Sequence, residues 1–152
     1  MIRLGNLYKT PDSSTLLTVF GSTALDTIRT PSKILKDVLG GAATFAGISA
    51  SFFVDTGLIA VVGTDFPKKY HSILQKYLDL SGLSVQKGKT FRYDGSYDDT
   101  LSTRTTNKTE LNVLGSFSPV VPEKYRKSQF VYLANNDPDQ NTELIKIGRA
   151  HV

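Results

Sequence analysis

The sequence is organised around residues 40–47, which read Gly40-Gly41-Ala42-Ala43-Thr44-Phe45-Ala46-Gly47. Two adjacent glycines let the backbone adopt angles that other residues avoid, and they let another molecule approach closely. The small residues that follow suit a helix that packs tightly on a sheet. A helix that begins here would direct free backbone N–H groups at whatever lies above the glycines. We therefore expect a small-molecule pocket here, with Gly40, Gly41 and Thr44 among its residues.

Apolar runs and helical patterns alternate on both sides of this stretch. The runs at 16–20 and 58–62 lack strict alternation, which is typical of strands buried on both faces of a parallel sheet. A helix is expected over 42–53, with most of its larger side chains, Phe45, Ile48, Phe52 and Phe53, in the core. A second helix is expected from Pro67 to about Leu78. A third buried strand is expected at 130–133, followed by a helix. This order predicts an α/β fold with a parallel sheet.

A different pattern covers residues 88–115. Apolar and polar residues alternate over 91–97, and the segments 100–106 and 110–114 are also strand-like. The region is too small for a separate domain, so we expect an antiparallel flap or lid beside the main sheet. Residues 27–39 are expected to be irregular or a short edge strand.

Two acidic residues follow predicted strands. Asp26 lies just beyond the strand at 16–20, and Asp137 lies just beyond the strand at 130–133. The carboxyl ends of parallel strands share one edge of a sheet, which is where ligands bind in open α/β folds. Two carboxylates beside the double glycine suit a polyhydroxylated ligand, because carboxylates accept hydrogen bonds from neighbouring hydroxyls. For each aspartate, a turn or helix cap is the alternative interpretation.

Composition excludes several other functions. The chain has 152 residues, no cysteine and a formal charge of +4 with its basic residues spread out, so disulfides, thiolate metal sites and a nucleic-acid patch are not expected. The two histidines, His71 and His151, lie far apart, which disfavours a histidine metal site or a catalytic triad. Gly88-Lys89-Thr90 resembles the end of a phosphate-binding P-loop, but the upstream glycine, Gly82, is one residue too far away for that motif. With no signal peptide and no membrane-length apolar run, we expect a cytoplasmic protein.

Four segments together resemble the ribokinase-like (PfkB) carbohydrate kinases. They are Val19-Phe20-Gly21-Ser22 followed by Asp26, then Gly40-Gly41 with its alanine-rich helix, then Ala60–Asp65, and finally Phe130–Pro138. Gly88–Arg92 and Leu133–Pro138 are similar to a bacterial branch known simply as sugar kinases. The resemblance covers about residues 16–146. It implies a three-layer α/β/α fold with a small β-sheet lid, of which this chain would hold the N-terminal part.

The resemblance also implies roles for individual residues. Asp26 would hold substrate hydroxyls, Gly40 and Gly41 would line the sugar site, and Asp137 would contact substrate. Arg92, on the lid, would cover the ligand, or it would be an ordinary surface residue.

Three positions depart from the pattern of ribokinases. Ala24, Ala42 and Phe45 stand where that pattern has polar residues. Because polar anchors have become apolar, ribose held in the usual way is not expected. The ligand is instead expected to carry an apolar or aromatic part, as a nucleoside does.

The catalytic signature of the family, D-T-x-G-A-G-D, does not occur in this sequence. In the family it supplies the catalytic base beside the site for ATP and Mg²⁺, in the C-terminal half. Phosphoryl transfer depends on positioning and charge stabilisation around the γ-phosphate. We therefore expect the substrate-binding half of an ATP-dependent sugar or nucleoside kinase, inactive alone, with no catalytic or metal-binding residues. Residues 1–15 are expected to form a leader, and 147–152 to be a non-native tail from a truncated reading frame.

Two alternatives stay open. The first is a non-catalytic binding module that keeps the sugar or nucleoside pocket. The second is an unrelated α/β domain in which the double glycine is only a contact between helix and sheet. The resemblance also implies a homodimer through the lid around Phe91–Tyr97. A half-domain would expose an apolar sheet edge, so we expect poor solubility or marginal stability.

Overall fold

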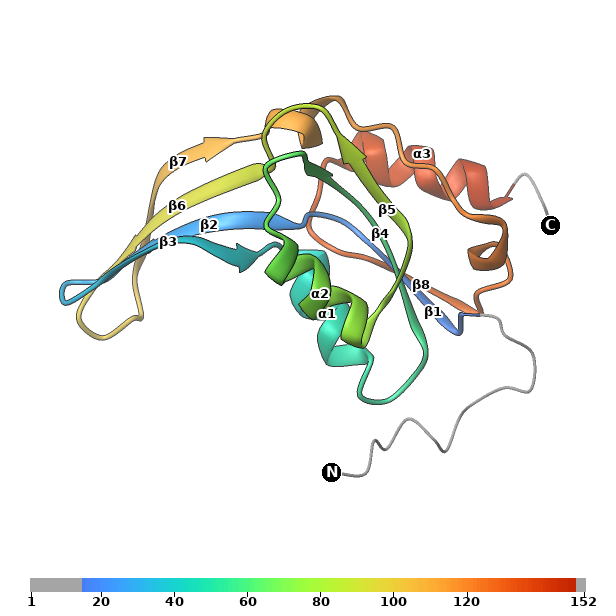
Figure 1. Ribbon diagram of the computed structural model, residues 1–152, viewed down its shortest axis with the longest axis horizontal. Helices are drawn as coiled ribbons and strands as arrows, with labels where there is room; N and C mark the ends of the chain where they lie inside the picture. Colours follow the sequence, from blue (N-terminus) through green and yellow to red (C-terminus); the bar gives the residue numbers. More distant parts are fainter. Residues whose placement is uncertain (1–14, 150–152) are drawn as a thin grey trace.

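The computed structural model describes residues 15–149. Residues 1–14, which make up most of the expected leader, and residues 150–152, at the end of the expected tail, lie outside the described residues. The described residues form two four-stranded sheets joined end to end (Figure 1).

The first sheet is parallel throughout, with the strand order β5-β4-β1-β8. Its strands are β1 (Leu17–Phe20), β4 (Thr56–Gly63), β5 (Asp79–Gln86) and β8 (Phe130–Leu133). All eight residues of β4 are buried, as expected for an apolar run in the middle of a parallel sheet. The strands expected at 16–20, 58–62 and 130–133 therefore all form.

Helices cover both faces of this sheet. On one face, α1 (Ala42–Ala50) and α2 (Lys68–Tyr77) pack through Ala43 and Leu74 against Val19 and Leu58. On the other, Leu144 of α3 (Pro138–Arg149) packs with Phe20 and Ile59, beside the short 3₁₀ turns η2 (Asn112–Ser116) and η3 (Glu123–Tyr125). This arrangement confirms the three-layer α/β/α fold. No helix in the described part of the chain is long and apolar enough to cross a bilayer.

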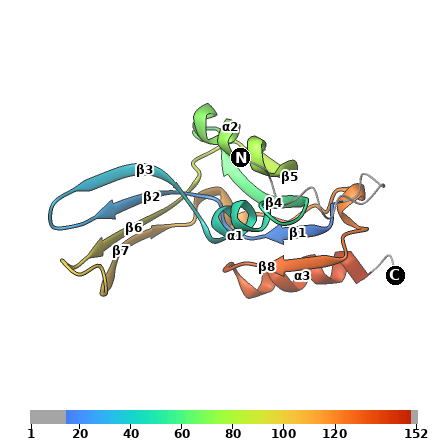
Figure 2. The same cartoon turned by 90° about the horizontal axis from the view of Figure 1, so that it is seen from below.

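The second sheet is the lid, with the strand order β3-β2-β6-β7. Its strands are β2 (Ala24–Arg29), β3 (Ile34–Gly40), β6 (Phe91–Tyr97) and β7 (Arg104–Glu110). Strands β2 and β6 run parallel, while β2–β3 and β6–β7 are antiparallel pairs. The lid projects from one end of the parallel sheet as a long arm, which two perpendicular views show (Figures 1 and 2).

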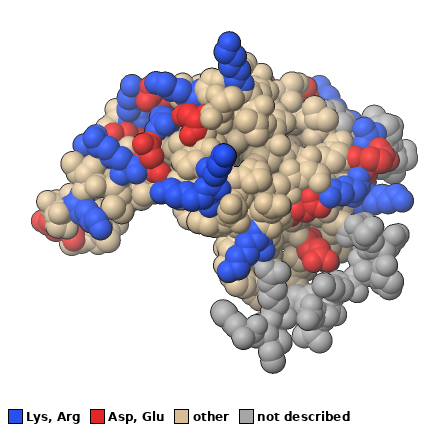
Figure 3. Space-filling view, viewed as in Figure 1, with Lys and Arg blue, Asp and Glu red and all other residues tan. Residues whose placement is uncertain are grey.

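The lid is larger than the sequence predicts. Residues 27–39 contribute most of the β2–β3 hairpin. Of the two expectations for this segment, irregular structure is wrong and an edge strand is confirmed, because β3 is the outer strand of the lid. The strand expected at 110–114 is also wrong, because β7 ends at Glu110 and η2 follows. Charged side chains of both signs crowd over the lid (Figure 3), where Arg29 pairs with Asp94 and Lys108 pairs with Glu110.

Helix α1 turns a different face to the sheet from the one expected. Its buried residues are the small ones, Ala43, Thr44 and Gly47, whereas Phe45, Phe52 and Phe53 are exposed. A side chain at Gly47 would bring its Cβ to within 3.2 Å of Leu78. The helix therefore packs too closely for large rings on its inner face.

Two strands differ from expectation at the edges of the parallel sheet. Strand β5 lies where the sequence predicts only the end of a helix. Gly82 is needed within it because a Cβ there would lie 2.6 Å from the Leu58 carbonyl oxygen and 2.9 Å from the Tyr125 ring. Strand β8 forms as predicted but is not buried, since Phe130, Val131 and Tyr132 are all exposed. It is one of the two outer strands, so one of its edges has no neighbouring strand among the described residues.

Candidate functional site

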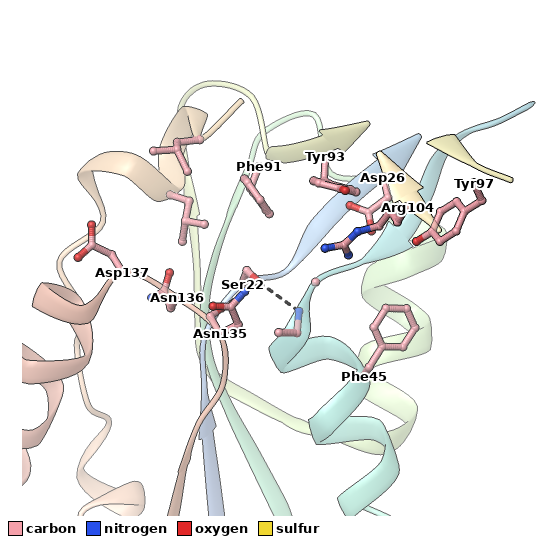
Figure 4. A pocket seen from close by; sticks show the side chains of 14 residues that line it. Ser22, Asp26, Phe45, Phe91, Tyr93, Tyr97, Arg104, Asn135, Asn136 and Asp137 are labelled. Atoms are coloured by element: carbon pink, nitrogen blue, oxygen red, sulfur yellow. Dashed lines mark hydrogen bonds between the residues drawn. The ribbon is translucent and has the colours of Figure 1, made fainter. Parts of the chain in front are cut away.

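A pocket of about 480 Å³ opens where the carboxyl ends of β1 and β8 meet the lid (Figure 4). The lid, the start of α1, η2 and the loops after β1 and β8 all contribute to its walls. The lining residues are Ser22, Asp26, Gly41, Ala42, Phe45, Phe91, Tyr93, Tyr97, Arg104, Leu111, Leu114, Asn135, Asn136 and Asp137. The pocket therefore lies at the edge of the sheet where the sequence predicts a ligand.

The double glycine is required by its neighbours. A Cβ at Gly40 would lie 2.0 Å from Oδ2 of Asp26, so any side chain there would collide with the carboxylate. Gly41 has φ = 98° and a Cβ there would lie 2.4 Å from the carbonyl oxygen of Ser22. Gly41 is thus restricted to glycine by backbone contact and by its backbone angle, whereas a side chain at Gly40 would require the Asp26 carboxylate to move.

Ser22, in the loop after β1, lies against the N-terminus of α1. The amide of Ala42 donates to its Oγ at 3.1 Å, and the amide of Ala43 donates to its carbonyl oxygen at 3.0 Å. The free N–H groups expected above the glycines are therefore already used at these two positions. The Ser22 hydroxyl in turn donates to the carbonyl of Asn135 at 3.5 Å, which links the loops after β1 and β8. Ser22 is a pocket residue that the sequence analysis missed.

Asp26 is the acidic group at the lid side of the pocket. Its Oδ1 is buried and has no hydrogen-bond partner in the described part of the chain. Burial raises the pKa of this carboxyl to about 6. A buried acceptor without a donor is unusual in a folded protein, and it suits a ligand that brings its own hydroxyl donor.

Asp137 lies at the opposite end of the pocket from Asp26 (Figure 4). Its Oδ1 accepts from the amide of Asp139 at 2.8 Å, and its carbonyl accepts from the amide of Asn141 at 3.0 Å. Asp137 therefore caps α3, as the alternative interpretation proposed, while it also lines the pocket. The two expected carboxylates share one cavity but do not converge on one point.

Thr44 and Arg92 do not line the pocket. Thr44 is fully buried and donates to Oγ1 of Thr23 at 3.2 Å, because it lies on the face of α1 that packs on the sheet. Arg92 lies on the other face of β6 from the pocket-lining Phe91 and Tyr93. Its guanidinium donates to Asp65 at 2.9 Å and also pairs with Asp37. Both residues have structural contacts in place of the expected ligand contact.

The contacts of Arg92 belong to a junction between lid and sheet. Thr90, at the start of β6, donates to Oδ1 of Asp65 through both its amide and its hydroxyl at 2.7 Å, and its hydroxyl accepts from the amide of Gly63 at 3.0 Å. Burial would raise the pKa of Asp65, but hydrogen bonds from Thr90 and Arg92 outweigh it and lower that pKa. Asp65 is therefore ionised and ties the lid to the end of β4.

Aromatic residues make up much of the remaining wall. Phe45 comes from α1, and Phe91, Tyr93 and Tyr97 come from one face of β6. Arg104 of β7 lies over the Tyr93 ring, with its guanidinium carbon 5.3 Å from the ring centroid. The alternation of apolar residues over 91–97 was visible in the sequence, but nothing local indicated that this face turns towards the double glycine.

The described residues do not fit a complete site for ATP and Mg²⁺. They contain no group of three or more histidine, cysteine, aspartate or glutamate side chains that could hold a metal ion. The G-A-G-D signature is likewise absent from the sequence. What the pocket offers is an acceptor, a cation, aromatic faces and amide side chains, which are groups for binding a small polar molecule.

No family model matches the chain. It is 29% identical over 136 residues to a cytidine kinase of Thermococcus kodakarensis, covering 85% of this chain and 46% of that protein. Its structure is similar to that of a Methanocaldococcus jannaschii nucleoside kinase, an archaeal member of the ribokinase family. The TM-score is 0.66 at 21% identity, covering 89% of this chain and 50% of that one.

A ribokinase from Cryptococcus neoformans in complex with ADP gives a TM-score of 0.66 at 12% identity, covering 93% of this chain and 47% of that one. The chain therefore spans about half the length of the kinases it matches. These similarities confirm the predicted resemblance to the ribokinase-like kinases and the ribokinase-like fold.

Proposed function

We propose that this chain binds the acceptor substrate of an ATP-dependent kinase, a sugar or nucleoside of which one hydroxyl receives the γ-phosphoryl group. The chain would supply the acceptor-binding half of the ribokinase-like domain, within about residues 16–146. The kinases that it resembles, among them a cytidine kinase and a ribokinase in complex with ADP, support this assignment.

The observation that carries the proposal is the unpartnered oxygen of Asp26. Its Oδ1 is buried beside the double glycine, at the edge of a pocket large enough for a small molecule. An ionised carboxylate accepts two hydrogen bonds from adjacent hydroxyls, which is the feature that sugars and ribosides share. Gly40 lets the backbone lie close to this carboxylate without a side chain in the way, and Gly41 does the same beside the backbone of Ser22 and Thr23.

The residues described here bind and orient an acceptor, and we assign them no step of the transfer itself. Asp26 would hold hydroxyls, and the lid would exclude water from above. The D-T-x-G-A-G-D signature, which in the family supplies the catalytic base, is absent from this sequence, and the described residues hold no cluster that could bind a metal ion. Purified alone, the chain is therefore expected to bind an acceptor and form no phosphorylated product when ATP and Mg²⁺ are added.

Isothermal titration of the purified chain with ribose and with cytidine tests the proposal. The variant Asp26→Asn keeps the shape of the side chain and removes its charge. It is expected to weaken binding at least about tenfold, because hydrogen bonds to a charged group contribute about 1.5–3 kcal/mol. Asp55→Asn, at an exposed acid between α1 and β4, is the matched control and should leave binding unchanged.

Equal affinities of Asp26→Asn and the parent chain, or no binding of either ligand, would contradict the proposed acceptor site. Formation of a sugar or nucleoside phosphate by the chain alone would contradict the assignment of only half a kinase to it. A non-catalytic binding module would give the same titrations. Adding the C-terminal half of a related kinase separates the two hypotheses: a kinase reaction supports the proposal, and no reaction supports the binding module.

A further inference from the structure

The two ends of the pocket differ in chemistry. At the end formed by the loops after β1 and β8, the walls are polar, with Ser22, Asn135 and Asn136 (Figure 4). At the lid end, Phe45 and Tyr97 present aromatic rings, and Arg104 lies beside them. Asp26 also lies at the lid end, so a ligand held by this carboxylate has aromatic surface within reach.

Phe45 exposes its ring to the pocket, where a ligand can cover it. Its side chain is 61% exposed, although it belongs to a helix with a buried inner face. Phe53, just beyond the end of the same helix, is 62% exposed but does not line the pocket. Covering an aromatic ring with another flat apolar surface is favourable both by area and by stacking geometry. Phe45 is therefore placed to gain from a planar ligand, and Phe53 is not.

Arg104 adds a hydrogen-bond donor to this aromatic end. Its guanidinium lies over the Tyr93 ring and points into the pocket (Figure 4). No carboxylate forms an ion pair with it in the described part of the chain. A guanidinium held against a ring keeps its N–H groups free in the plane, where they can donate to a carbonyl oxygen.

The charges of the pocket favour a neutral ligand over an anionic one. Asp26 and Asp137 are acidic and Arg104 is basic, so the lining has one more acid than base. A sugar phosphate would meet two carboxylates for one guanidinium. A free pentose would satisfy Asp26 but leave the rings of Phe45 and Tyr97 in water.

We propose that the lid end is a base subsite and that the acceptor is a nucleoside. The planar base lies against Phe45 and Tyr97, a carbonyl on the base accepts from Arg104, and the ribose hydroxyls donate to Asp26. This inference rests on the proposed function, since it names the acceptor class for the same pocket.

Titration of the chain and of three variants with cytidine and with ribose tests it. Base–aromatic stacking is worth enough that Phe45→Ala should weaken cytidine binding about tenfold or more. The same variant should leave ribose binding within about twofold, because ribose has no base to stack. Phe53→Ala, the control of equal exposure, should change neither affinity, and Arg104→Met should weaken cytidine alone.

The outcomes separate this inference from the proposed function. Ribose bound as tightly as cytidine, or equal effects of Phe45→Ala and Phe53→Ala, would overturn the base subsite while the acceptor site stands, provided that Asp26→Asn still weakens both ligands. Binding of both ligands that is unchanged in Asp26→Asn, or no binding of either ligand by the parent chain, would overturn the proposed function and this inference with it. Far-ultraviolet circular dichroism of each variant shows whether the fold is kept.

Discussion

Asp26 combines two properties that are rarely found in one structural carboxylate. One oxygen occupies the space that a Cβ at Gly40 would need, and the other has no hydrogen-bond partner in the described part of the chain. Its raised pKa follows from burial without a compensating donor. A site that stabilised only the empty protein would not leave this acceptor unpaired, because each unpaired buried group costs about 1–3 kcal/mol.

The raised pKa of Asp26 predicts a pH-dependent stability. The pKa of Asp26 is about 6 in the folded protein and 3.8 for an ordinary carboxyl, so folding favours its protonated form. The contribution of Asp26 to the free energy of unfolding is therefore fully present below about pH 4 and is lost as the pH rises through about 6. Urea unfolding should therefore be compared at pH values of about 4.5 and 7.5. Between them, the free energy of unfolding of Asp26→Asn should rise relative to that of the parent chain by about 1 kcal/mol, after allowance for partial solvent screening.

The parent chain alone does not isolate this effect. Two other carboxyls, Asp79 and Asp94, have pKa values lowered to about 2, so they act in the opposite direction. At Asp79, burial is outweighed by hydrogen bonds from Lys124 and other groups, and Asp94 is hydrogen-bonded to Arg29. Their influence falls mostly below about pH 4 and is shared by parent and variant. A difference between parent and Asp26→Asn that does not change with pH would show that Asp26 is ordinarily solvated.

Which site residues could be predicted depended on whether the signal was local. Asp26 and Gly41 were predicted at the pocket, which they line, because strand ends and adjacent glycines are visible in a few residues of sequence. Phe45 was noted as an apolar replacement at the ligand site but was also expected in the core, and Arg104 was not predicted, because their positions depend on which face of α1 packs on the sheet and on the pairing of β6 with β7. Arg92 was misplaced for the same reason, since a shift of one residue along β6 changes the face.

At the scale of elements, the central strands were predictable and the edge strands were not. Strand β4 is apolar over most of its length, so its burial follows from sequence. Strand β5 holds Gly82 because the Tyr125 ring packs there, and its hydroxyl donates to the Asp79 carbonyl at 2.7 Å. The residues around Gly82 give no sign that a tyrosine far along the chain packs against it.

The junction between lid and sheet is expected to depend on Thr90. Its hydroxyl is fully buried and connects Asp65 to the amide of Gly63. Thr90→Val keeps the shape but leaves a buried amide unpaired, so the free energy of unfolding should fall by about 2 kcal/mol. Chemical denaturation measures this change.

Thr106→Val on β7 is the control, because Thr106 is exposed and bonds only the Tyr93 hydroxyl, at 2.9 Å, among described partners. It should change stability by no more than about 0.5 kcal/mol. Similar losses in the two variants would mean that the junction is not special. A stable Thr90→Val protein would mean that the lid is held mainly by its strand contacts.

At the scale of the whole molecule, the exposed edge of β8 is the main departure from a self-contained domain. An outer strand usually carries charges or proline that block further pairing. Here Phe130, Val131 and Tyr132 are all exposed and apolar or aromatic. The expectation that a chain about half the length of its relatives exposes an apolar sheet edge agrees with this strand; low solubility stays a prediction.

Self-association through β8 follows as a measurable consequence. Val131 is 54% exposed on β8, and Val85 is 60% exposed on β5 at the opposite edge. Val131→Lys should markedly reduce concentration-dependent association in sedimentation velocity, because a lysine on an edge opposes strand addition. Val85→Lys should leave association unchanged. Equal effects of the two substitutions would remove β8 as the cause.

The dimer expected through the lid around Phe91–Tyr97 stays a separate prediction. Strand β6 lies between β2 and β7, so it has no free edge and would meet a second copy only through a face of the lid. A dimer that survives Val131→Lys would favour this route over association through β8.

The contact between Asp26 and Gly40 also has a consequence for the substitutions that the protein tolerates. A carboxylate at position 26 fills the space that any side chain at position 40 would need. The two positions are therefore coupled: a side chain at position 40 would displace the Asp26 carboxylate from the place it now occupies. Replacing Asp26 by a smaller residue would remove this obstacle, so a substitution at position 40 should be better tolerated in that background than in the parent chain.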